Sequence, residues 1–182
     1  FKPQIIIHLA AQSIVRLSYK KPLETFSTNI LGSANILEYS RHCKSLKSLI
    51  YVTSDKCYEN KENNKAYKES DRIGGSDPYS ASKAAAENLF SSYLKSFFVF
   101  NKFGASTVRS GNVIGGGDWS VDRIIPDIIK SLKKKKNLIV RNPNSTRPWQ
   151  NVLDVIYGYL TLASKLYSNP KLHGESFNFG PS

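Results

Sequence analysis

The sequence predicts an α/β fold: a Rossmann-like, doubly wound parallel sheet, incomplete at the N-terminus, joined to part of a smaller substrate-binding α/β region. Two observations lead to this prediction. Short apolar runs rich in β-branched residues alternate with segments of helical spacing, and small or polar residues follow the runs. Strands that alternate with helices build β-α-β units, whose parallel strands are covered by helices on both faces.

Size and composition agree with such a fold. The chain has 182 residues, of which 40% are hydrophobic, which suits about one domain with a packed core. No run approaches the ~18 consecutive apolar residues of a membrane-spanning helix, so no membrane partner is expected. The chain contains no Met and begins with Phe1, which favours a true start further upstream.

Local patterns place the elements of the first part of the chain. The apolar run at residues 5–11 ends in small residues and predicts a buried strand followed by a loop. Helical spacing over residues 22–40, with Pro22 in the first turn, predicts a helix. The β-prone run at residues 46–52 predicts a second buried strand.

The second part follows the same alternation after a polar loop at residues 59–77. Asp77 suits the N-cap and Pro78 the first turn of a helix that extends from residue 79 to about residue 98. Later elements are expected at residues 105–109 (strand), 122–135 (helix), 138–140 (strand) and 152–167 (helix).

Polar or small residues follow three of the predicted strands, at residues 8–12, 53–56 and 110–117. Ligands bind at the carboxyl ends of the strands in such sheets, so these sets should converge on one cleft. The last set contains three consecutive glycines without the Lys-Ser/Thr of a phosphate-binding P-loop. We therefore interpret it as a loop on the substrate side.

Tyr79 and Lys83 are the first candidates for chemistry. They lie four residues apart on a predicted helix and therefore share one face. An ammonium group near a phenol stabilises the phenolate, so Lys83 is expected to lower the pKa of Tyr79. Such a tyrosine can take a proton from an alcohol while a hydride leaves the carbon. An ordinary tyrosine and a surface lysine are the alternative, because this spacing alone is common.

Several longer motifs make the pair more specific. They are TSDKCYEN at 53–60, GSDPYSASK at 75–83, RSGNVIGGGDW at 109–119 and RPWQ at 147–150. Together they resemble the sugar-nucleotide 4,6-dehydratases of the extended short-chain dehydrogenase/reductase family, and most closely the branch that acts on CDP-glucose. The resemblance spans nearly the whole chain and implies an NAD-dependent hydro-lyase.

The resemblance also implies the catalytic roles. Tyr79 would remove the 4-hydroxyl proton as C4 of the sugar gives up a hydride, while Lys83 holds the nicotinamide ribose. Ser54 would hydrogen-bond the 4-oxygen, and Asp55 would protonate the departing 6-hydroxyl. Water would leave across C5 and C6, and the hydride would return to C6. The product would be CDP-4-keto-6-deoxyglucose, with no net redox change.

Lys56 stands where many related dehydratases have a glutamate that acts as the C5 base. A lysine could act as this base only when neutral, which requires burial or a neighbouring cation. Alternatively it stays charged and stabilises the enolate. A surface lysine without a role in the chemistry is the third alternative.

Cofactor and substrate residues follow from the same resemblance. Three strand-end residues and one helix residue would contact NAD together with Tyr79 and Lys83: Leu9, Ala10, Ala11 and Asn29. Asn112, Arg123 and Arg147 would hold the diphosphate, for which the planar fork of an arginine is well suited. The alternatives are core filling for the strand-end residues, a helix-internal Asn29 and surface arginines.

The positive charge balance could also indicate a protein that binds nucleic acid. The net charge is +12, and half of the excess lies in the last third of the chain, chiefly Lys130 and the run at residues 133–136. We interpret the run as a solvated helix end, where cations favour the helix dipole. Aromatic residues are not interleaved with it as a stacking surface would require, so no nucleic-acid partner is expected.

Two cysteines, Cys43 and Cys57, lie 14 residues apart, and we expect both to be reduced, buried thiols in a cytoplasmic protein. No cluster has metal-ligand spacing, so no metal is expected.

The sequence lacks the Gly-x-x-Gly-x-x-Gly turn that binds the dinucleotide pyrophosphate. The chain therefore resembles the middle of a dehydratase. Residues 1–112 would form a partial NAD-binding domain with the catalytic residues. Residues 113–182 would form a partial substrate-binding region interleaved with the last Rossmann elements.

We expect this piece alone to bind NAD poorly and to be inactive. The full protein would be a homodimer or higher homo-oligomer in deoxysugar and O-antigen biosynthesis. Another sugar-nucleotide epimerase or dehydratase, and a catalytically silent fragment, are the alternatives.

Overall fold

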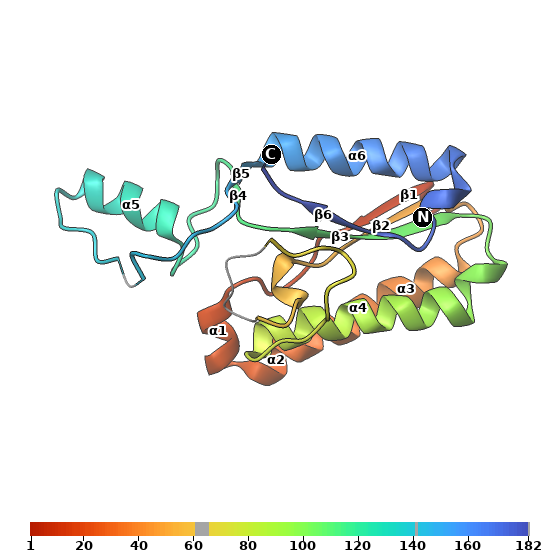
Figure 1. The fold of residues 1–182 in the computed structure, drawn as a ribbon, viewed down its shortest axis with the longest axis horizontal. Coiled ribbons are helices and arrows are strands. Elements are labelled where there is room, and N and C mark those ends of the chain that lie inside the picture. The colour runs from red at the N-terminus through yellow and green to blue at the C-terminus, as the bar shows by residue number, and fades with distance from the viewer. Residues whose placement is uncertain (61–65, 141, 182) are drawn as a thin grey trace.

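A parallel sheet lies between two layers of helices in the computed structural model, which describes residues 1–60, 66–140 and 142–181 (Figure 1). Within these residues its strands run in the order β1-β2-β3-β6, and all neighbours are parallel. They are β1 (Ile5–His8), β2 (Ser48–Val52), β3 (Gly104–Ser110) and β6 (Ser176–Phe179). This confirms the predicted doubly wound α/β fold. Strand β6 was not predicted from the sequence.

Helices cover both faces of this sheet. Figure 1 shows α3 (Gly32–His42) and α4 (Pro78–Ser96) on one face and α6 (Val152–Ser168) on the other. The predicted start of α4 is confirmed, because the Asp77 carboxylate accepts a hydrogen bond from the backbone N–H of Ser80 and Pro78 is the first helical residue. The predicted helix at 152–167 is likewise confirmed as α6.

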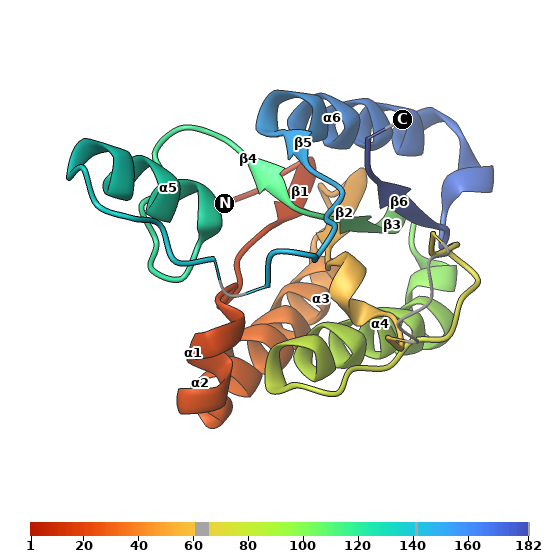
Figure 2. The ribbon, with the colours of Figure 1, turned by 60° about the vertical axis from the view of Figure 1, so that its left-hand side comes forward.

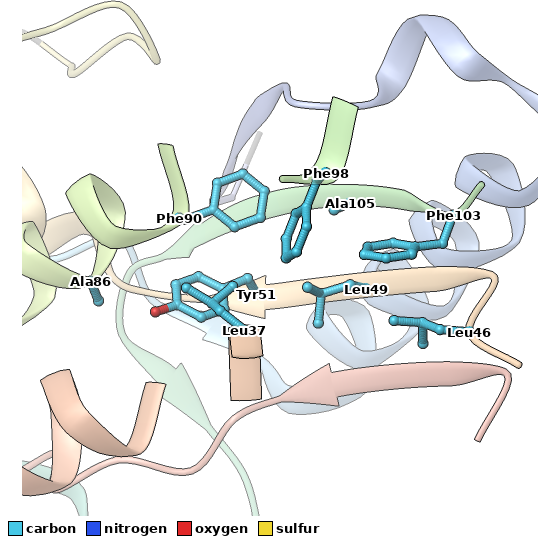
Figure 3. Packing of buried hydrophobic residues seen from close by; sticks show 9 residues of the cluster. All are labelled: Leu37, Leu46, Leu49, Tyr51, Ala86, Phe90, Phe98, Phe103 and Ala105. Atoms are coloured by element: carbon cyan, nitrogen blue, oxygen red, sulfur yellow. The ribbon is translucent and has the colours of Figure 1, made fainter. Parts of the chain in front are cut away.

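The core explains why β2 is buried on both faces. Successive side chains of a strand point to opposite faces, so Leu49 and Tyr51 pack under α3 and α4, whereas Ile50 packs against α6. Figure 3 shows the first of these two clusters. Its members are Leu37, Leu46, Leu49, Tyr51, Ala86, Phe90, Phe98, Phe103 and Ala105.

The predicted helix at residues 22–40 is interrupted. It consists of α2 (Pro22–Phe26), a π-helical turn (Ser27–Leu31) and α3, and a short helix, α1 (Val15–Lys20), precedes it. Helix α1 and the π-helical turn were not predicted from the sequence. Such turns occur frequently at functional sites. Here the turn contains the buried Asn29.

Residues 113–140 and 142–149 stand apart from the sheet, as Figures 1 and 2 show for α5 (Ile124–Lys133). Two very short strands, β4 (Val113–Ile114) and β5 (Gln150–Asn151), pair in parallel at the base of this segment. Among the residues of α5, only Pro126 is buried. We call residues 113–149 the outer segment.

Two strand predictions need correction. Residues 138–140 form no strand, because no neighbouring backbone pairs with them, and Ile139 is 86% exposed. The first strand is present, but Ile5 is 50% exposed, because β1 lies at the edge of the sheet instead of inside it. The predicted loop at 59–77 is irregular where it is described, and residues 61–65 within it lie outside the described residues.

No helix among the described residues is long and apolar enough to cross a membrane.

Candidate active site

The predicted catalytic residues lie where β2 ends and α4 begins. Ser54 follows β2 and is buried, and Tyr79 and Lys83 are buried on the first two turns of α4. The loop before α4 is packed closely on that helix at Gly75. A Cβ there would lie 2.3 Å from the backbone carbon of Ser80, so only glycine fits.

A short 3-10 helix (Asp55–Cys57) follows Ser54 directly. Ser54 caps it, because its Oγ accepts a hydrogen bond of 3.2 Å from the backbone N–H of Lys56. The same hydroxyl donates to Asp55 Oδ1 at 3.0 Å. Asp55 and Lys56 are half-buried, so both side chains can reach solvent or a ligand. This cap fixes the direction of the Ser54 hydroxyl relative to α4.

Burial raises the pKa of Tyr79 above its ordinary value, and nearby Asp55 and Asp77 raise it further. A hydrogen bond with the Ser54 side chain and the positive charge of Arg123 lower this pKa by less than burial raises it. The expectation that Lys83 holds the pKa of Tyr79 below its ordinary value is therefore wrong. The physical reason is that a phenolate enclosed by protein loses its hydration.

Burial also acts on Lys83 and lowers its pKa to about 8. A negative charge on the Cys57 sulfur or on the Glu87 carboxylate opposes this shift, because negative charge stabilises the ammonium form. His8, at the end of β1, has its pKa lowered by burial and then by the charge of Lys83. Its Nε2 lies 3.1 Å from Ser33 Oγ, in agreement with a packed, hydrogen-bonded histidine.

Asn29 joins the loop after β1 to α4. Its Oδ1 accepts from the backbone N–H of Gln12 at 2.8 Å, and its Nδ2 donates to the Gln12 carbonyl at 3.0 Å and to Ser82 Oγ at 2.9 Å. Ser82 Oγ in turn donates to the carbonyl of Tyr79 at 2.7 Å. Both amide hydrogens of Asn29 are thus engaged within the protein, and a direct contact with a cofactor stays a prediction.

The strand-end residues do not fill the core. Leu9 is 59% exposed, Ala10 is exposed and Ala11 is half-buried. The core-filling alternative is therefore wrong for Leu9 and Ala10. Small or exposed side chains at this edge leave room for a ligand to approach the backbone.

The predicted substrate residues lie at the base of the outer segment and within it. The Asn112 carbonyl accepts from the backbone N–H of Gln150 at 3.0 Å, and Pro148 packs on Gly111, where a Cβ would lie 2.4 Å from Pro148 Cγ. The chain stretch that contains Arg147 is thereby brought beside Asn112. The exposed Arg147 side chain donates to the carbonyl of Thr146 at 2.7 Å.

Arg123 immediately precedes α5 and reaches the loop after β1. Its Nη2 donates to Ser13 Oγ at 2.9 Å, and its Nε lies 3.9 Å from an Asp118 carboxylate oxygen. Because Arg123 also influences the pKa of Tyr79, it lies closer to the reacting groups than its position in the sequence suggests.

A buried ion pair at this site was not predicted. Arg109 Nη2 lies 2.8 Å from Glu87 Oε2, Arg109 Nε lies 3.0 Å from Glu87 Oε1, and each side chain is 5% exposed. Glu87 follows Lys83 by four residues, so Tyr79, Lys83 and Glu87 form one buried stripe along α4. The spacing of four residues between Tyr79, Lys83 and Glu87 was the pattern in the sequence that could have indicated that Glu87 is buried beside them.

Other predictions can be compared with the structure. The Lys run does begin at a helix end, because α5 ends at Lys133. Lys130 Nζ donates to the Trp119 carbonyl at 3.0 Å. Cys43 and Cys57 are both free, as predicted, although Cys43 is only half-buried. Within the described residues, no group of three or more His, Cys, Asp or Glu side chains could hold a metal ion.

Comparisons with known proteins agree on one family. The residue pattern of the NAD dependent epimerase/dehydratase family matches residues 1–180. The chain is 47% identical over 186 residues to CDP-glucose 4,6-dehydratase of Salmonella typhimurium, across 100% of this chain and 52% of that protein. It is 33% identical over 169 residues to dTDP-D-glucose 4,6-dehydratase of Dictyostelium discoideum, across 87% of this chain and 38% of that protein.

A solved structure shows the same fold. UDP-glucuronic acid 4-epimerase from Bacillus cereus, in complex with UDP-glucuronic acid and NAD, superposes with a TM-score of 0.84 at 26% identity. The match covers 98% of this chain and 54% of that one. The chain thus spans about half the length of the relatives it matches, or less.

Proposed function

This chain belongs to the NAD dependent epimerase/dehydratase family, and from this premise we propose that the protein is a sugar-nucleotide 4,6-dehydratase that converts CDP-glucose to CDP-4-keto-6-deoxyglucose. One observation carries the proposal. Ser54 and Asp55, at the end of β2, lie beside the buried Tyr79 of α4 in a chain that is 47% identical to a CDP-glucose 4,6-dehydratase.

The residues around the site fit NAD as the cofactor. Lys83 offers a buried cation one turn from Tyr79, and the exposed Leu9 and Ala10 follow β1 together with the half-buried Ala11. These three, with Lys83, Tyr79 and the nearby Asn29, are our proposed cofactor contacts. NAD, when bound, would accept the hydride from C4 of the sugar and return it to C6.

Tyr79 begins the reaction by taking the proton of the 4-hydroxyl, which Ser54 orients by a hydrogen bond. Burial raises the pKa of Tyr79, which opposes its role as a base. The hydrogen bond with Ser54 and the positive charge of Arg123 act in the opposite direction and support that role. Proton transfer of this kind contributes about 10²- to 10⁴-fold to the rate.

Asp55 and Lys56 serve the loss of water. A ketone at C4 acidifies the proton at C5, since the carbanion is an enolate, and Asp55 protonates the 6-hydroxyl as it leaves. Lys56 is only half-buried, whereas a lysine that acts as a neutral base needs deep burial or a neighbouring cation. Partial burial therefore favours the charged lysine as the group that stabilises the enolate.

Asn112, Arg123 and Arg147 are proposed to bind the diphosphate of the nucleotide. Their side chains supply two guanidinium groups and one amide, and an arginine binds phosphate through two parallel hydrogen bonds. In this assignment residues 1–112 form the partial NAD-binding domain and residues 113–182 the partial substrate-binding region, although β6 and α6 return to the sheet.

We further propose a cytoplasmic enzyme of deoxysugar and O-antigen biosynthesis that acts as a homodimer or higher homo-oligomer. Exposed apolar side chains on the helical layer from Tyr19 to Tyr39 support an interface there. They are Tyr19, Leu23, Leu31 and Tyr39.

The reaction is tested with CDP-glucose deuterated at C4, with UDP-glucose and dTDP-glucose as competing substrates. We expect the full-length protein to form, from CDP-glucose, a product that has lost one water and has the deuterium at C6. A product of unchanged mass would identify an epimerase. Faster turnover of UDP-glucose or dTDP-glucose would overturn the assignment of CDP-glucose as the substrate.

A further inference from the structure

The Glu87–Arg109 ion pair takes no part in the chemistry described above, yet it is the most deeply buried pair of charges among the described residues. Its two parallel contacts, at 2.8 and 3.0 Å, make it bidentate. Removing two charges from water is costly unless further hydrogen bonds satisfy their remaining groups. The groups that satisfy this pair therefore indicate what it holds in place.

Two of these groups are neighbours of the catalytic segment, which we define as residues 54–57. Thr53 Oγ1 donates to Glu87 Oε1 at 2.5 Å, and Arg109 Nη1 donates to Tyr58 Oη at 2.8 Å. Thr53 directly precedes the segment and Tyr58 directly follows it. Each end is thus attached to one partner of the same ion pair.

The catalytic segment lies beyond the last residue of β2 and contains a short 3-10 helix, closed by a hydrogen bond of 3.0 Å from Cys57 N to the Ser54 carbonyl. Turns of this length have poor hydrogen-bond geometry and are weak by themselves. Backbone hydrogen bonds also hold its ends, because Thr53 N donates to the Val108 carbonyl at 2.9 Å and Gly74 N donates to the Cys57 carbonyl at 2.8 Å. The two side-chain anchors add to these contacts, and the bond from Thr53 ties the segment to α4 through Glu87.

Glu87 also connects this segment to the catalytic helix. It lies on α4 one turn after Lys83 and two turns after Tyr79, on the same buried stripe. A bond from Thr53 to Glu87 consequently sets the position of Ser54 relative to the Tyr79 phenol. Ser54 and Tyr79 must act on the same sugar oxygen in the proposed reaction.

We propose that the Glu87–Arg109 pair is a positioning device that, through Thr53 and Tyr58, holds Ser54 and Asp55 in register with Tyr79. The kinetic consequences of this proposal rest on the proposed function. The placement of the segment itself does not, and it can be measured separately.

Thr107 offers a matched control within the same network. Its Oγ1 lies 3.2 Å from Glu87 Oε2 and 2.8 Å from Ser176 Oγ, and its side chain is buried like that of Thr53. Thr107 lies in the middle of β3, away from residues 54–57 in the chain. A valine at either position removes a hydroxyl from Glu87 and keeps the shape of the side chain.

The experiment compares Thr53→Val, Tyr58→Phe and Thr107→Val in the full-length protein. We expect Thr53→Val and Tyr58→Phe to lower kcat at least ~10-fold, because displacing a catalytic group by 1 Å can cost 10²-fold. KM should stay within about two-fold, since the binding residues are untouched. Thr107→Val should keep kcat within about two-fold of the value for the unmodified protein, although it should lose about as much thermal stability as Thr53→Val.

Alkylation of Cys57 supplies a readout that needs no activity. Cys57 lies fully buried in the segment, and burial raises the pKa of its thiol to about 12, so it should react slowly with N-ethylmaleimide. We expect Thr53→Val to increase the alkylation rate of the Cys57 peptide several-fold, as quantified by mass spectrometry, and Thr107→Val to leave it unchanged.

Equal losses of kcat and equal alkylation rates in Thr53→Val and Thr107→Val would overturn the positioning role, because the network would then only stabilise the fold. If the unmodified protein turns over none of the sugar nucleotides, the proposed function fails. In that case faster alkylation in Thr53→Val alone still supports the positioning role, and equal rates overturn it.

Discussion

The catalytic end of the sheet and the outer segment differ in how their charged side chains are held. At the end of the sheet, Lys83, Glu87 and Arg109 are all buried and hydrogen-bonded or electrostatically coupled to one another. In the outer segment Arg147 is exposed, and Arg123 makes its closest contact with a serine of another loop. The charged groups that surround the proposed catalytic residues are therefore preorganised, whereas the arginines proposed for binding the substrate are not.

The difference follows from packing. The strands β2 and β3 are covered on both faces, so polar groups among them must find partners inside the protein. Helix α5 buries only Pro126 among the described residues, and its apolar residues Ile124, Ile129 and Leu132 stay exposed. A segment with so few buried contacts opens at low free-energy cost, which suits a part that closes on a substrate.

The largest expected effect comes from Tyr79→Phe, which removes a single hydroxyl from the preorganised region. We expect formation of the 4-keto product to fall by about 10²- to 10⁴-fold, because the base for the 4-hydroxyl proton is lost. The melting temperature should change little, since the ring still fills its place. Product formation is measured by mass spectrometry.

Tyr93→Phe is the matched control on the same helix. It removes a hydroxyl that donates to Glu38 at 3.0 Å, away from the proposed chemistry. Turnover of Tyr79→Phe equal to that of Tyr93→Phe would remove Tyr79 from the mechanism.

The second prediction compares the ion pairs of the two regions directly. Arg109→Met leaves the Glu87 carboxylate buried without its partner, at an expected cost of about 3–5 kcal/mol in the free energy of unfolding. Arg16→Met breaks the pair of Arg16 and Asp122 between α1 and the outer segment, whose side chains are 57% and 26% exposed. We expect a cost of about 0.2–1 kcal/mol there.

Both variants are measured by urea denaturation of the full-length protein. Equal losses in the free energy of unfolding would show that the two ion pairs stabilise the protein equally, which would contradict the difference between the two regions.

The third prediction uses the pH dependence of stability. Burial lowers the pKa of Lys83 from 10.5 to about 8, despite Glu87 and Cys57, so the unfolded chain binds more protons than the folded one between these values. Below about pH 8 the buried ammonium group of Lys83 therefore destabilises the folded protein. This destabilisation is lost as the pH rises to about 10.5. Relative to Lys83→Met, the free energy of unfolding should rise by on the order of 3 kcal/mol across this window.

Lys95→Met controls for the loss of one ammonium group, because Lys95 is exposed near the end of the same helix. If the difference in free energy of unfolding between the native protein and Lys83→Met does not change from pH 8 to 10.5, the assigned burial of Lys83 is contradicted.

Much of the fold was predictable because its signals are local. The continuous apolar, β-prone run that contains Leu49, Ile50 and Tyr51 predicts a buried strand, and Asp77 with Pro78 marks the start of α4 to the residue. The strand β6 was missed, since a short run such as residues 176–179 becomes a strand only beside β3. The predicted strand at 138–140 failed for the converse reason, because it has no neighbour.

The candidate site shows the same limit. Motifs identified Ser54, Asp55, Tyr79 and Lys83, whose types and spacing indicate chemistry. The direction of the pKa shift of Tyr79 was wrong, because it depends on the burial of the phenol more than on the neighbour one turn away.

The sequence by itself determined the alternation of strands and helices through most of the chain, the start of α4 and the residue types at the site, because periodicity and capping act over a few residues. Only the tertiary structure decided that Glu87 pairs with Arg109, that Asn29 binds Gln12 and Ser82, and that Thr53 and Tyr58 are anchored. These contacts join residues between 17 and 53 positions apart. Such contacts form because the buried polar groups of a close-packed sheet and helix have no water to bind and must bind one another.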